Sequence, residues 1–189
     1  GVPHWYEIVT SILPDGYTEL EYIESTGTQY IDTGIKPTAQ TSVSVKASIL
    51  SLSAGPSFCG SLQGSAGLLI GTDGSGAGQL YANSTSGSVS GYTIEVDSIY
   101  EFTLEQTTLS VKKAGASAQT FTGVTAVTAT NNNISMIGRN NNGTMQRLGS
   151  FHYYYMRIYN NGTLVRDFVP VRRNSDNVVG MFDMVTQTF

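Results

Sequence analysis

The strongest constraint in this sequence is an alternation of apolar and polar residues with a period of two. In the segment Thr41–Leu50 (TSVSVKASIL), Val, Ala and Ile occupy one face, and Ser residues with Lys46 occupy the other. Successive side chains of a β-strand point to opposite faces, so this pattern predicts a strand with one buried face. Further short segments of strand character, most of them bounded by Gly or Asn, are Leu20–Ile23, Gln29–Thr33, Gly67–Thr72, Gln79–Ala82, Ile99–Leu104, Leu109–Lys113, Ile134–Gly138, Phe151–Tyr159, Leu164–Val171 and Val178–Met184.

No segment combines a cap with the 3.6-residue spacing of an amphipathic helix. About a dozen short strands with frequent turn residues between them are typical of two packed antiparallel sheets. We therefore expect an all-β, two-sheet antiparallel sandwich with essentially no helix. The turn signal Leu13-Pro14-Asp15-Gly16 divides the chain into residues 1–13, a linker or an added edge strand, and residues 14–189, a single domain.

Composition excludes several other classes of protein. Only 13% of the 189 residues are charged, which is too few for the exposed faces of a coiled coil or a helical bundle. The net charge of −4 argues against a nucleic-acid partner, because such partners require a basic surface. No apolar run approaches the roughly 18 residues of a membrane span, so we expect no membrane insertion. The single cysteine, Cys59, excludes an intramolecular disulfide.

The sequence Asn160-Asn161-Gly162-Thr163 predicts a hairpin between the two strands that flank it. A two-residue loop would set Ile158 opposite Val165, whereas a three-residue loop with a bulge would set Ile158 opposite Leu164. The residues alone leave both registers open.

Simple alternation along the strand before this hairpin places Tyr154, Met156 and Ile158 in the core. The outer face would then carry a row of four residues, Tyr153, Tyr155, Arg157 and Tyr159. Aromatic faces can stack on sugar rings, and hydroxyl or guanidinium groups can bind sugar hydroxyls, so this row is a candidate glycan site. Tyrosine is also a strong strand former, and cross-strand aromatic pairs stabilise sheets without any ligand. Residues at expected loops or strand ends that could add polar contacts, or could simply form turns, are Arg139, Asn140, Tyr81 and Asn83.

Two longer stretches resemble a known family. They are Leu13–Ile35 (LPDGYTELEYIESTGTQYIDTGI) and Arg157–Phe182 (RIYNNGTLVRDFVPVRRNSDNVVGMF). Both resemble a bacterial and prophage module of the laminin-G-like, concanavalin A-like lectin/glucanase group of jelly rolls. The resemblance implies a jelly roll that forms one module of a larger surface, secreted or phage-tail protein. It therefore implies an extracellular or virion location, neighbouring domains in a longer chain, and binding to a glycan or a cell-surface partner rather than catalysis.

The resemblance also brings alternatives. A purely structural or assembly module would show the same outer face packed against a neighbouring domain. Some glucanases of this fold carry Glu-x-Asp-x-x-Glu on one strand, and the segment containing Glu19, Glu21 and Glu24 matches this pattern loosely. We predict no catalytic residue, because charged residues on an edge strand also discourage aggregation. Relatives of this kind often hold Ca²⁺, for which Asp73, Asp97 and Asp183 are available. Because no dense acidic loop exists, we predict no metal site or cofactor, and Ca²⁺ stays open as the alternative.

Overall fold

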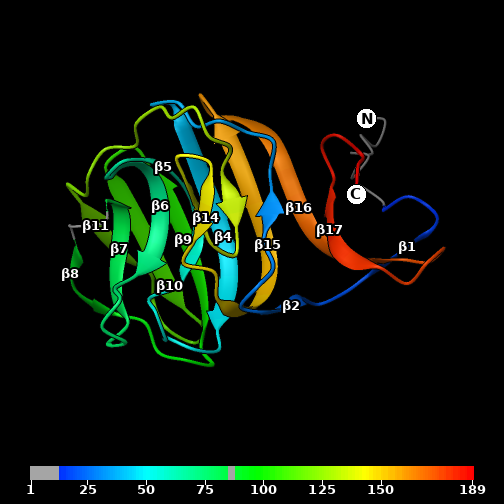
Figure 1. The fold of residues 1–189 in the computed structure, drawn as a ribbon, viewed down its shortest axis with the longest axis horizontal. Helices are drawn as coiled ribbons and strands as arrows, with labels where there is room; N and C mark the ends of the chain where they lie inside the picture. Colours follow the sequence, from blue (N-terminus) through cyan, green and yellow to red (C-terminus); the bar gives the residue numbers. More distant parts are fainter. Residues whose placement is uncertain (1–12, 85–87) are drawn as a thin grey trace, which may run out of the picture.

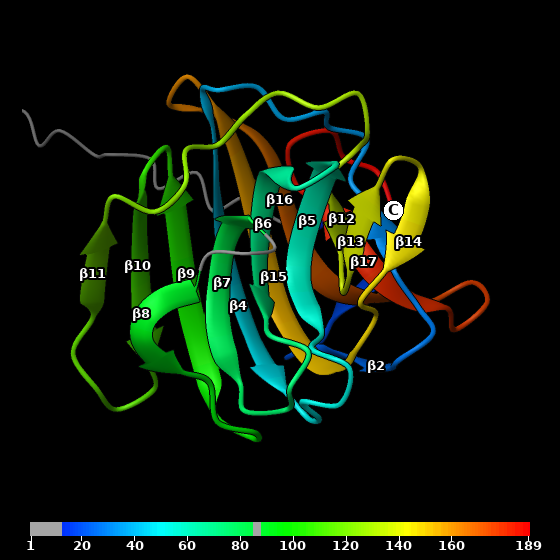
Figure 2. The same ribbon diagram turned by 60° about the vertical axis from the view of Figure 1, so that its left-hand side comes forward.

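Two β-sheets packed face to face form the protein (Figures 1 and 2). The structure is a computed structural model that describes residues 13–84 and 88–189, and these residues contain no helix. The expected all-β sandwich of antiparallel sheets, with a jelly-roll-like architecture, is therefore confirmed. The predicted N-terminal linker lies outside the described residues except for Leu13. Over the described part of the chain, no helix has the length and apolar character needed to span a membrane.

The larger sheet has nine strands, in the order β1-β16-β15-β4-β9-β10-β11, with β17 also paired to β16 and β2 also paired to β15. Its strands are β1 (Tyr17–Glu19), β2 (Ile23–Thr26), β4 (Thr41–Ile49), β9 (Ile99–Glu105), β10 (Thr108–Lys113), β11 (Gln119–Thr122), β15 (Ser150–Asn160), β16 (Thr163–Arg173) and β17 (Val179–Asp183).

The smaller sheet has eight strands, in the order β14-β13-β5-β6-β7-β8, and β12 joins β3 to β5 at its edge. The pairing of β13 with β5 is parallel, in contrast to the antiparallel pairs around it. Its strands are β3 (Ile31–Asp32), β5 (Ser57–Gln63), β6 (Ala66–Thr72), β7 (Gln79–Ser84), β8 (Ser88–Thr93), β12 (Ser135–Met136), β13 (Arg139–Asn141) and β14 (Thr144–Gln146).

The core lies between the two sheets. The alternation in β4 is confirmed, because its Val, Ala and Ile side chains are fully buried there. Across from them, β5 and β6 contribute Phe58, Leu68 and Ile70, which are also inaccessible to solvent. Each such side chain contributes about 1.5–3 kcal/mol relative to an exposed position, so the apolar face of each strand determines which way it packs.

A β-bulge in β15 changes the expected faces of its tyrosines. Tyr153 pairs with Ala47, but the next paired residue, Tyr155, lies opposite Lys46, so Tyr154 is an extra residue in the ladder. Paired residues of an antiparallel ladder share a face, and Ala47 is buried. Tyr153 is therefore in the core, with no exposed surface, and Tyr154 is turned out of it. The prediction that Tyr153 lies on the outer face and Tyr154 in the core was wrong.

The hairpin between β15 and β16 has the shorter of the two loops considered, Asn161-Gly162, and both residues have positive φ (48° and 76°) as a type I′ turn requires. Tyr159 pairs with Leu164, but the register then shifts and Ile158 pairs with Arg166. Neither predicted register is therefore correct. The loop has two residues, but a bulge at Val165 shifts the pairing, so Ile158 lies opposite Arg166 rather than Val165 or Leu164.

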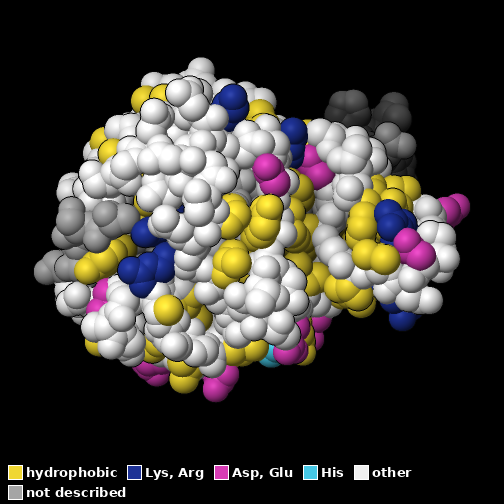
Figure 3. Space-filling model, in the orientation of Figure 1, with side chains coloured by type: hydrophobic (Ala, Val, Ile, Leu, Met, Phe, Trp, Pro, Cys, Tyr) yellow, Lys and Arg dark blue, Asp and Glu magenta, His cyan; other side chains and the backbone are white. Residues whose placement is uncertain are grey.

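Beyond this hairpin β15 and β16 diverge, and two strands from the N-terminal part of the domain, β1 and β2, pair with their separated ends. β1 pairs with the end of β16, from Tyr17 opposite Arg173 to Glu19 opposite Val171. β2 pairs with β15, with Ile23 opposite Tyr153. With β17 on the other edge of β16, the strands β1 and β17 and the end of β16 form a wing that projects at the right of Figure 1. Figure 3 shows apolar side chains exposed on this wing, where Val178, Val179 and Phe189 are among the exposed large apolar residues.

Candidate functional site

The predicted site residues divide between the two sheets. Tyr155, Arg157 and Tyr159 remain together on the outer face of β15, whereas Tyr153 is removed from them by the bulge. Arg139 and Asn140 lie on β13 of the smaller sheet, and Tyr81 and Asn83 lie on β7. The structure therefore does not gather the predicted residues at one place.

Asn83 is a structural residue. Its side chain is fully buried, its Oδ1 accepts a hydrogen bond from the Leu69 amide (3.1 Å), and its Nδ2 donates to the carbonyls of Thr125 (2.8 Å) and Gln106 (3.4 Å). These hydrogen bonds connect β7 to β6 and to two loops, and the buried Asn83 side chain is not accessible to a ligand. The burial and the three hydrogen bonds of Asn83 favour the structural alternative for this residue, while Tyr81 remains half-buried on the same strand and stays a predicted contact.

The outer face of β15, which we call the β15 face, is built of paired cations and aromatic rings. The Arg157 guanidinium lies 4.7 Å from the Tyr155 ring centroid, and its Nε lies 3.0 Å from Asp167 Oδ1. Lys46 Nζ lies 5.3 Å from the centroid of Tyr154. Both contacts fall within the range of cation–π interaction. The guanidinium therefore already has an anion and a ring as partners within the protein.

The β15 face also includes residues that the sequence analysis did not select. The Tyr22 ring stacks on His152 with centroids 4.1 Å apart and tilts against Tyr154 at 5.6 Å. Lys46 Nζ lies 3.8 Å from Glu101 Oε1. This surface is aromatic, and the charges of Lys46 and Arg157 are compensated by Glu101 and Asp167, so it is suited to packing against a flat partner as well as to stacking on a sugar.

A polar hollow of about 160 Å³ lies at the edge of the smaller sheet. Three chain segments form it: β3, the start of β12, and the β13–β14 hairpin. β3 and β12 pair directly, with Asp32 opposite Ser135. We call this hollow the Tyr30 pocket, and its lining residues are Tyr30, Asp32, Asn133, Ser135, Asn140, Gly143 and Met145.

The polar groups of the Tyr30 pocket are held by hydrogen bonds that leave other atoms available to a ligand. Asp32 Oδ1 accepts from the Gly34 amide (2.8 Å), and Asp32 Oδ2 accepts from Asn133 Nδ2 (3.2 Å). Asn140 Oδ1 accepts from the Gly143 amide (3.0 Å), which leaves its Nδ2 as a donor. The side chain of Tyr30 is 50% exposed, so its ring stands at the rim. The pocket therefore presents an aromatic face, a carboxylate and amide groups within one small volume.

A sharp chain reversal brings Asn140 to this pocket. Ile137 has φ of 62°, which is rare for a β-branched residue, and Gly138 follows with φ of 144°. The Ile137 amide donates to the Phe58 carbonyl (3.0 Å), and the packed core around this buried side chain holds the conformation.

Arg139, immediately after this reversal, is not among the pocket residues. Its Nη2 donates to Gln146 Oε1 across the β13–β14 hairpin (3.2 Å), and its Nε is buried without a hydrogen-bond partner. Burial, together with the nearby charge of Arg147, lowers the pKa of Arg139. We therefore assign Arg139 to the packing of this hairpin.

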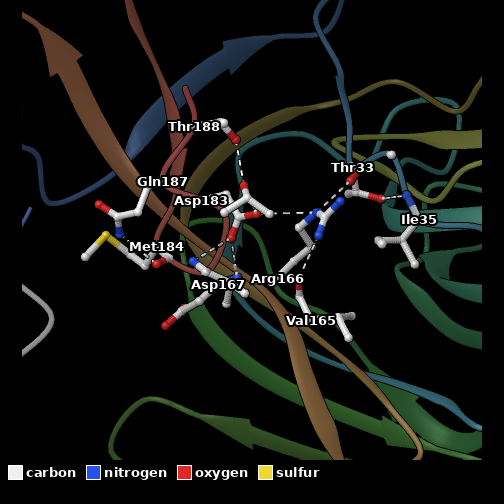
Figure 4. Close-up of polar contacts among 12 residues, drawn as sticks. Thr33, Ile35, Val165, Arg166, Asp167, Asp183, Met184, Gln187 and Thr188 are labelled. Atoms are coloured by element: carbon white, nitrogen blue, oxygen red, sulfur yellow. Dashed lines mark hydrogen bonds and ion pairs between the residues drawn. The ribbon is translucent and has the colours of Figure 1, made fainter.

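The strand that carries Asp32 is fastened from behind by an ionic network (Figure 4). Arg166 Nε donates to the Thr33 carbonyl (3.3 Å) and lies 3.3 Å from Asp183 Oδ2. Asp183 is buried, and its Oδ1 accepts from the amides of Asp167 (2.9 Å) and Val185 (3.1 Å). Strands β16 and β17 thus hold the position of β3 through a single arginine.

The three glutamates of the glucanase-like pattern do not share a strand. β1 ends at Glu19, and β2 begins only at Ile23. Glu19 lies opposite Val171 of β16, whereas Glu24 lies opposite His152 of β15, with 3.4 Å between Glu24 Oε2 and His152 Nε2. The same-strand geometry that a retaining pair would need is therefore absent from this segment.

The aspartates considered for calcium have structural partners. Asp73 closes the β6–β7 loop by accepting bonds from the Ser75 hydroxyl and from the amides of Ser75 (3.3 Å) and Gln79 (3.0 Å), and the Ser75 hydroxyl lowers its pKa. Asp97 lies in the turn before β9, and Asp183 belongs to the network described above. Among the described residues, no group of three His, Cys, Asp or Glu side chains could hold a metal ion.

Comparison with known proteins adds no family assignment: no family model and no curated protein matches the chain. The residues of the Tyr30 pocket other than Asn140 were missed by sequence reasoning. Tyr30 and Asp32 are two positions apart within the predicted strand Gln29–Thr33. Residues with this spacing lie on the same face of a strand, so the sequence could have indicated that an aromatic ring and a carboxylate lie side by side. Asn133 lies about 100 residues further along the chain, and only the pairing of β3 with β12 brings it to Asp32.

Proposed function

We propose that this protein is a non-catalytic carbohydrate-binding module and that the Tyr30 pocket is its binding site. The observation that carries this proposal is the exposed Tyr30 ring beside the hydrogen-bonded pair Asp32–Asn133 and the amide of Asn140. Sugars offer an apolar ring face and several neighbouring hydroxyl groups. An aromatic rim with polar groups at its base has both features needed to recognise them.

The free atoms of the pocket support this assignment. Asn140 Nδ2 can donate a hydrogen bond, while Asp32 and the Oδ1 atom of Asn133 can accept one. Each hydroxyl of a vicinal diol both donates and accepts, so alternating donors and acceptors match it. Hydrogen bonds to the Asp32 carboxylate are charge-assisted and therefore contribute more than neutral ones.

The β15 face is the second place at which a glycan could bind, and it supports the proposal less well. Arg157 already pairs with Asp167 and covers Tyr155. A ligand would have to displace these contacts, whereas Tyr30 and Asn140 offer groups without such competition. Because the cations of the β15 face are already paired with carboxylates, this surface is better suited to an alternative role, packing against a neighbouring domain of a longer chain.

The wider context of the proposal follows from the resemblance to laminin-G-like and concanavalin A-like modules of bacterial and prophage proteins. A sandwich of this class would serve as an adhesion module in a surface, secreted or phage-tail protein. The low charge of the chain fits such a role, since Ser, Thr, Asn and Gly rather than ionic groups cover the strands.

Binding to a glycan array, followed by calorimetric titration with the best glycan, tests the proposal. We expect Tyr30→Ala to weaken binding by about tenfold, because the stacking contact is worth roughly 1 kcal/mol or slightly more. Tyr155→Ala on the β15 face is the matched control and should leave affinity unchanged. Loss of binding in the control alone would move the site to the β15 face. The absence of binding to any glycan would reject the proposal and favour a structural or assembly module.

A further inference from the structure

We infer that the Tyr30 pocket selects neutral glycans and discriminates against sugars that carry a carboxylate at the bound residue. This inference rests on the proposed function and adds to it the class of ligand. It follows from the charge of the pocket lining, the volume of the pocket and the contacts of Arg166 behind β3.

The pocket carries one charged side chain among its described lining residues, and that charge is negative. Asp32 is exposed, while the other lining residues are neutral: two asparagines, a tyrosine, a serine, a glycine and a methionine. A carboxylate placed about 4 Å from Asp32 would lose about fivefold in affinity even at the dielectric constant of water, and more at a partly desolvated rim. Neutral sugars avoid this repulsion and still receive the acceptor bonds of Asp32.

Arg166, which donates to the carbonyl of the residue that follows β3, does not reverse this polarity. Arg166 Nε lies 3.3 Å from Asp183 Oδ2 and from the Thr33 carbonyl, and Nη1 donates to the Val165 carbonyl (2.8 Å). Its charge is compensated by a buried carboxylate behind the strand, as Figure 4 shows. Among the described lining residues, a ligand carboxylate in the pocket therefore finds no cation with which to pair.

The volume of the Tyr30 pocket limits how many sugar residues of a glycan can contact Asp32. About 160 Å³ is less than the roughly 300–1,000 Å³ of pockets that enclose a drug-sized ligand. The pocket therefore accommodates one sugar residue, with the remainder of the chain outside it. Selection should thus concern the sugar residue that enters the pocket, most directly the terminal one.

The experiment uses an array of neutral oligosaccharides, each printed beside the same oligosaccharide capped with a sialic or uronic acid. We expect the wild-type protein to bind the neutral member at least fivefold more tightly. Asp32→Asn removes the charge, keeps an acceptor oxygen for the Gly34 amide, and permits Asn133 to rotate its amide and remain hydrogen-bonded. This variant should narrow the ratio between neutral and capped glycans. The matched control, Asp97→Asn, makes the same change in net charge outside the pocket at a φ of 58° that Asn also adopts, and should preserve the ratio.

The outcomes separate this inference from the proposed function. Equal or tighter binding of the capped glycans, still dependent on Tyr30, would overturn the selectivity and leave carbohydrate binding intact. A preference for neutral glycans that Asp32→Asn leaves unchanged would show that the cap is excluded by its bulk, and would also overturn the inference. Failure of every glycan to bind would reject both statements together.

Discussion

The buried carboxylate of Asp183 provides the most demanding test of how this fold is held together. In Asp183→Asn the side chain keeps its shape and one acceptor oxygen for the amides of Asp167 and Val185. The second oxygen becomes an NH₂ group. The Thr186 hydroxyl, 2.6 Å from this position in the native protein, can rotate and accept a hydrogen bond from it, but Arg166 Nε, 3.3 Å away, can only donate. Donor then faces donor at a position that is only 2% exposed.

The size of the effect follows from these contacts. Removing one partner of a buried ion pair typically costs about 3–5 kcal/mol, because the remaining charge is left uncompensated. The Arg166 side chain is 24% exposed and keeps its bonds to two carbonyls, so we expect the lower limit, about 3 kcal/mol. For a domain of this length such a loss lowers Tm by about 6–12 °C.

Urea unfolding and calorimetry of Asp183→Asn, Arg166→Met and the double variant measure the interaction directly. We expect the double variant to be more stable than the sum of the single losses predicts, by at least 1 kcal/mol, since residues in contact couple by roughly 0.5–3 kcal/mol. Asp176→Asn, which breaks the exposed pair with Arg173 (2.7 Å), serves as a control with a much smaller effect. Losses that add to within about 0.5 kcal/mol would refute the network as a stabilising unit.

Three further predictions concern the core and the turns. Tyr153→Ala should cost about 3–5 kcal/mol in urea unfolding and Tyr155→Ala less than about 1 kcal/mol, and the reverse order would contradict the β15 bulge. Burial raises the pKa of the Cys59 thiol from 9.0 to about 12. The unfolded chain therefore loses this proton first, and stability should fall by up to about 1.4 kcal/mol per pH unit between these values. A Cys59→Ala variant that keeps the full slope would disprove this origin. Gly67→Ala should be far more destabilising than Gly162→Ala, because both have positive φ but only at Gly67 would a Cβ strike the Ser61 carbonyl; similar melting temperatures for the two would contradict that packing.

The strands that face the core on one side were predictable, since burial imposes a period of two on their sequence. β4 and β9 fall where the alternation indicates. β5 was not predicted, because nearly all of its residues are buried and no alternation remains to be read. Several small-sheet strands of two or three residues, such as β13 and β14, contain mostly polar residues that resemble turns.

The two bulges show the limit of reading faces from spacing. One extra residue reverses the parity of every position that follows it, and nothing in the run of tyrosines 153–155 marks which one is extra. Packing decides, because Tyr153 donates to the Phe58 carbonyl inside the core while Tyr154 lies over Tyr22 and Lys46. The Tyr30 pocket was hidden for a related reason, since its walls come from parts of the chain that meet only through tertiary pairing.

The divergence of β15 and β16, whose ends pair with β1 and β2, also has a consequence for the order in which the chain can fold during synthesis. β1 finds its partner in residues 171–173, about 150 positions later, and β3 is fastened by Arg166 and Asp183. Such distant pairings are slow to form and leave earlier strands unpaired meanwhile. Until residues 166–183 have been synthesised, β1 lacks its partner strand, and β3, although it can pair with β12, lacks the contact with Arg166 and Asp183. The position of β3 at the Tyr30 pocket is thus fixed only after β16 and β17 have been synthesised, so the proposed glycan binding would also report on the folding of these two strands.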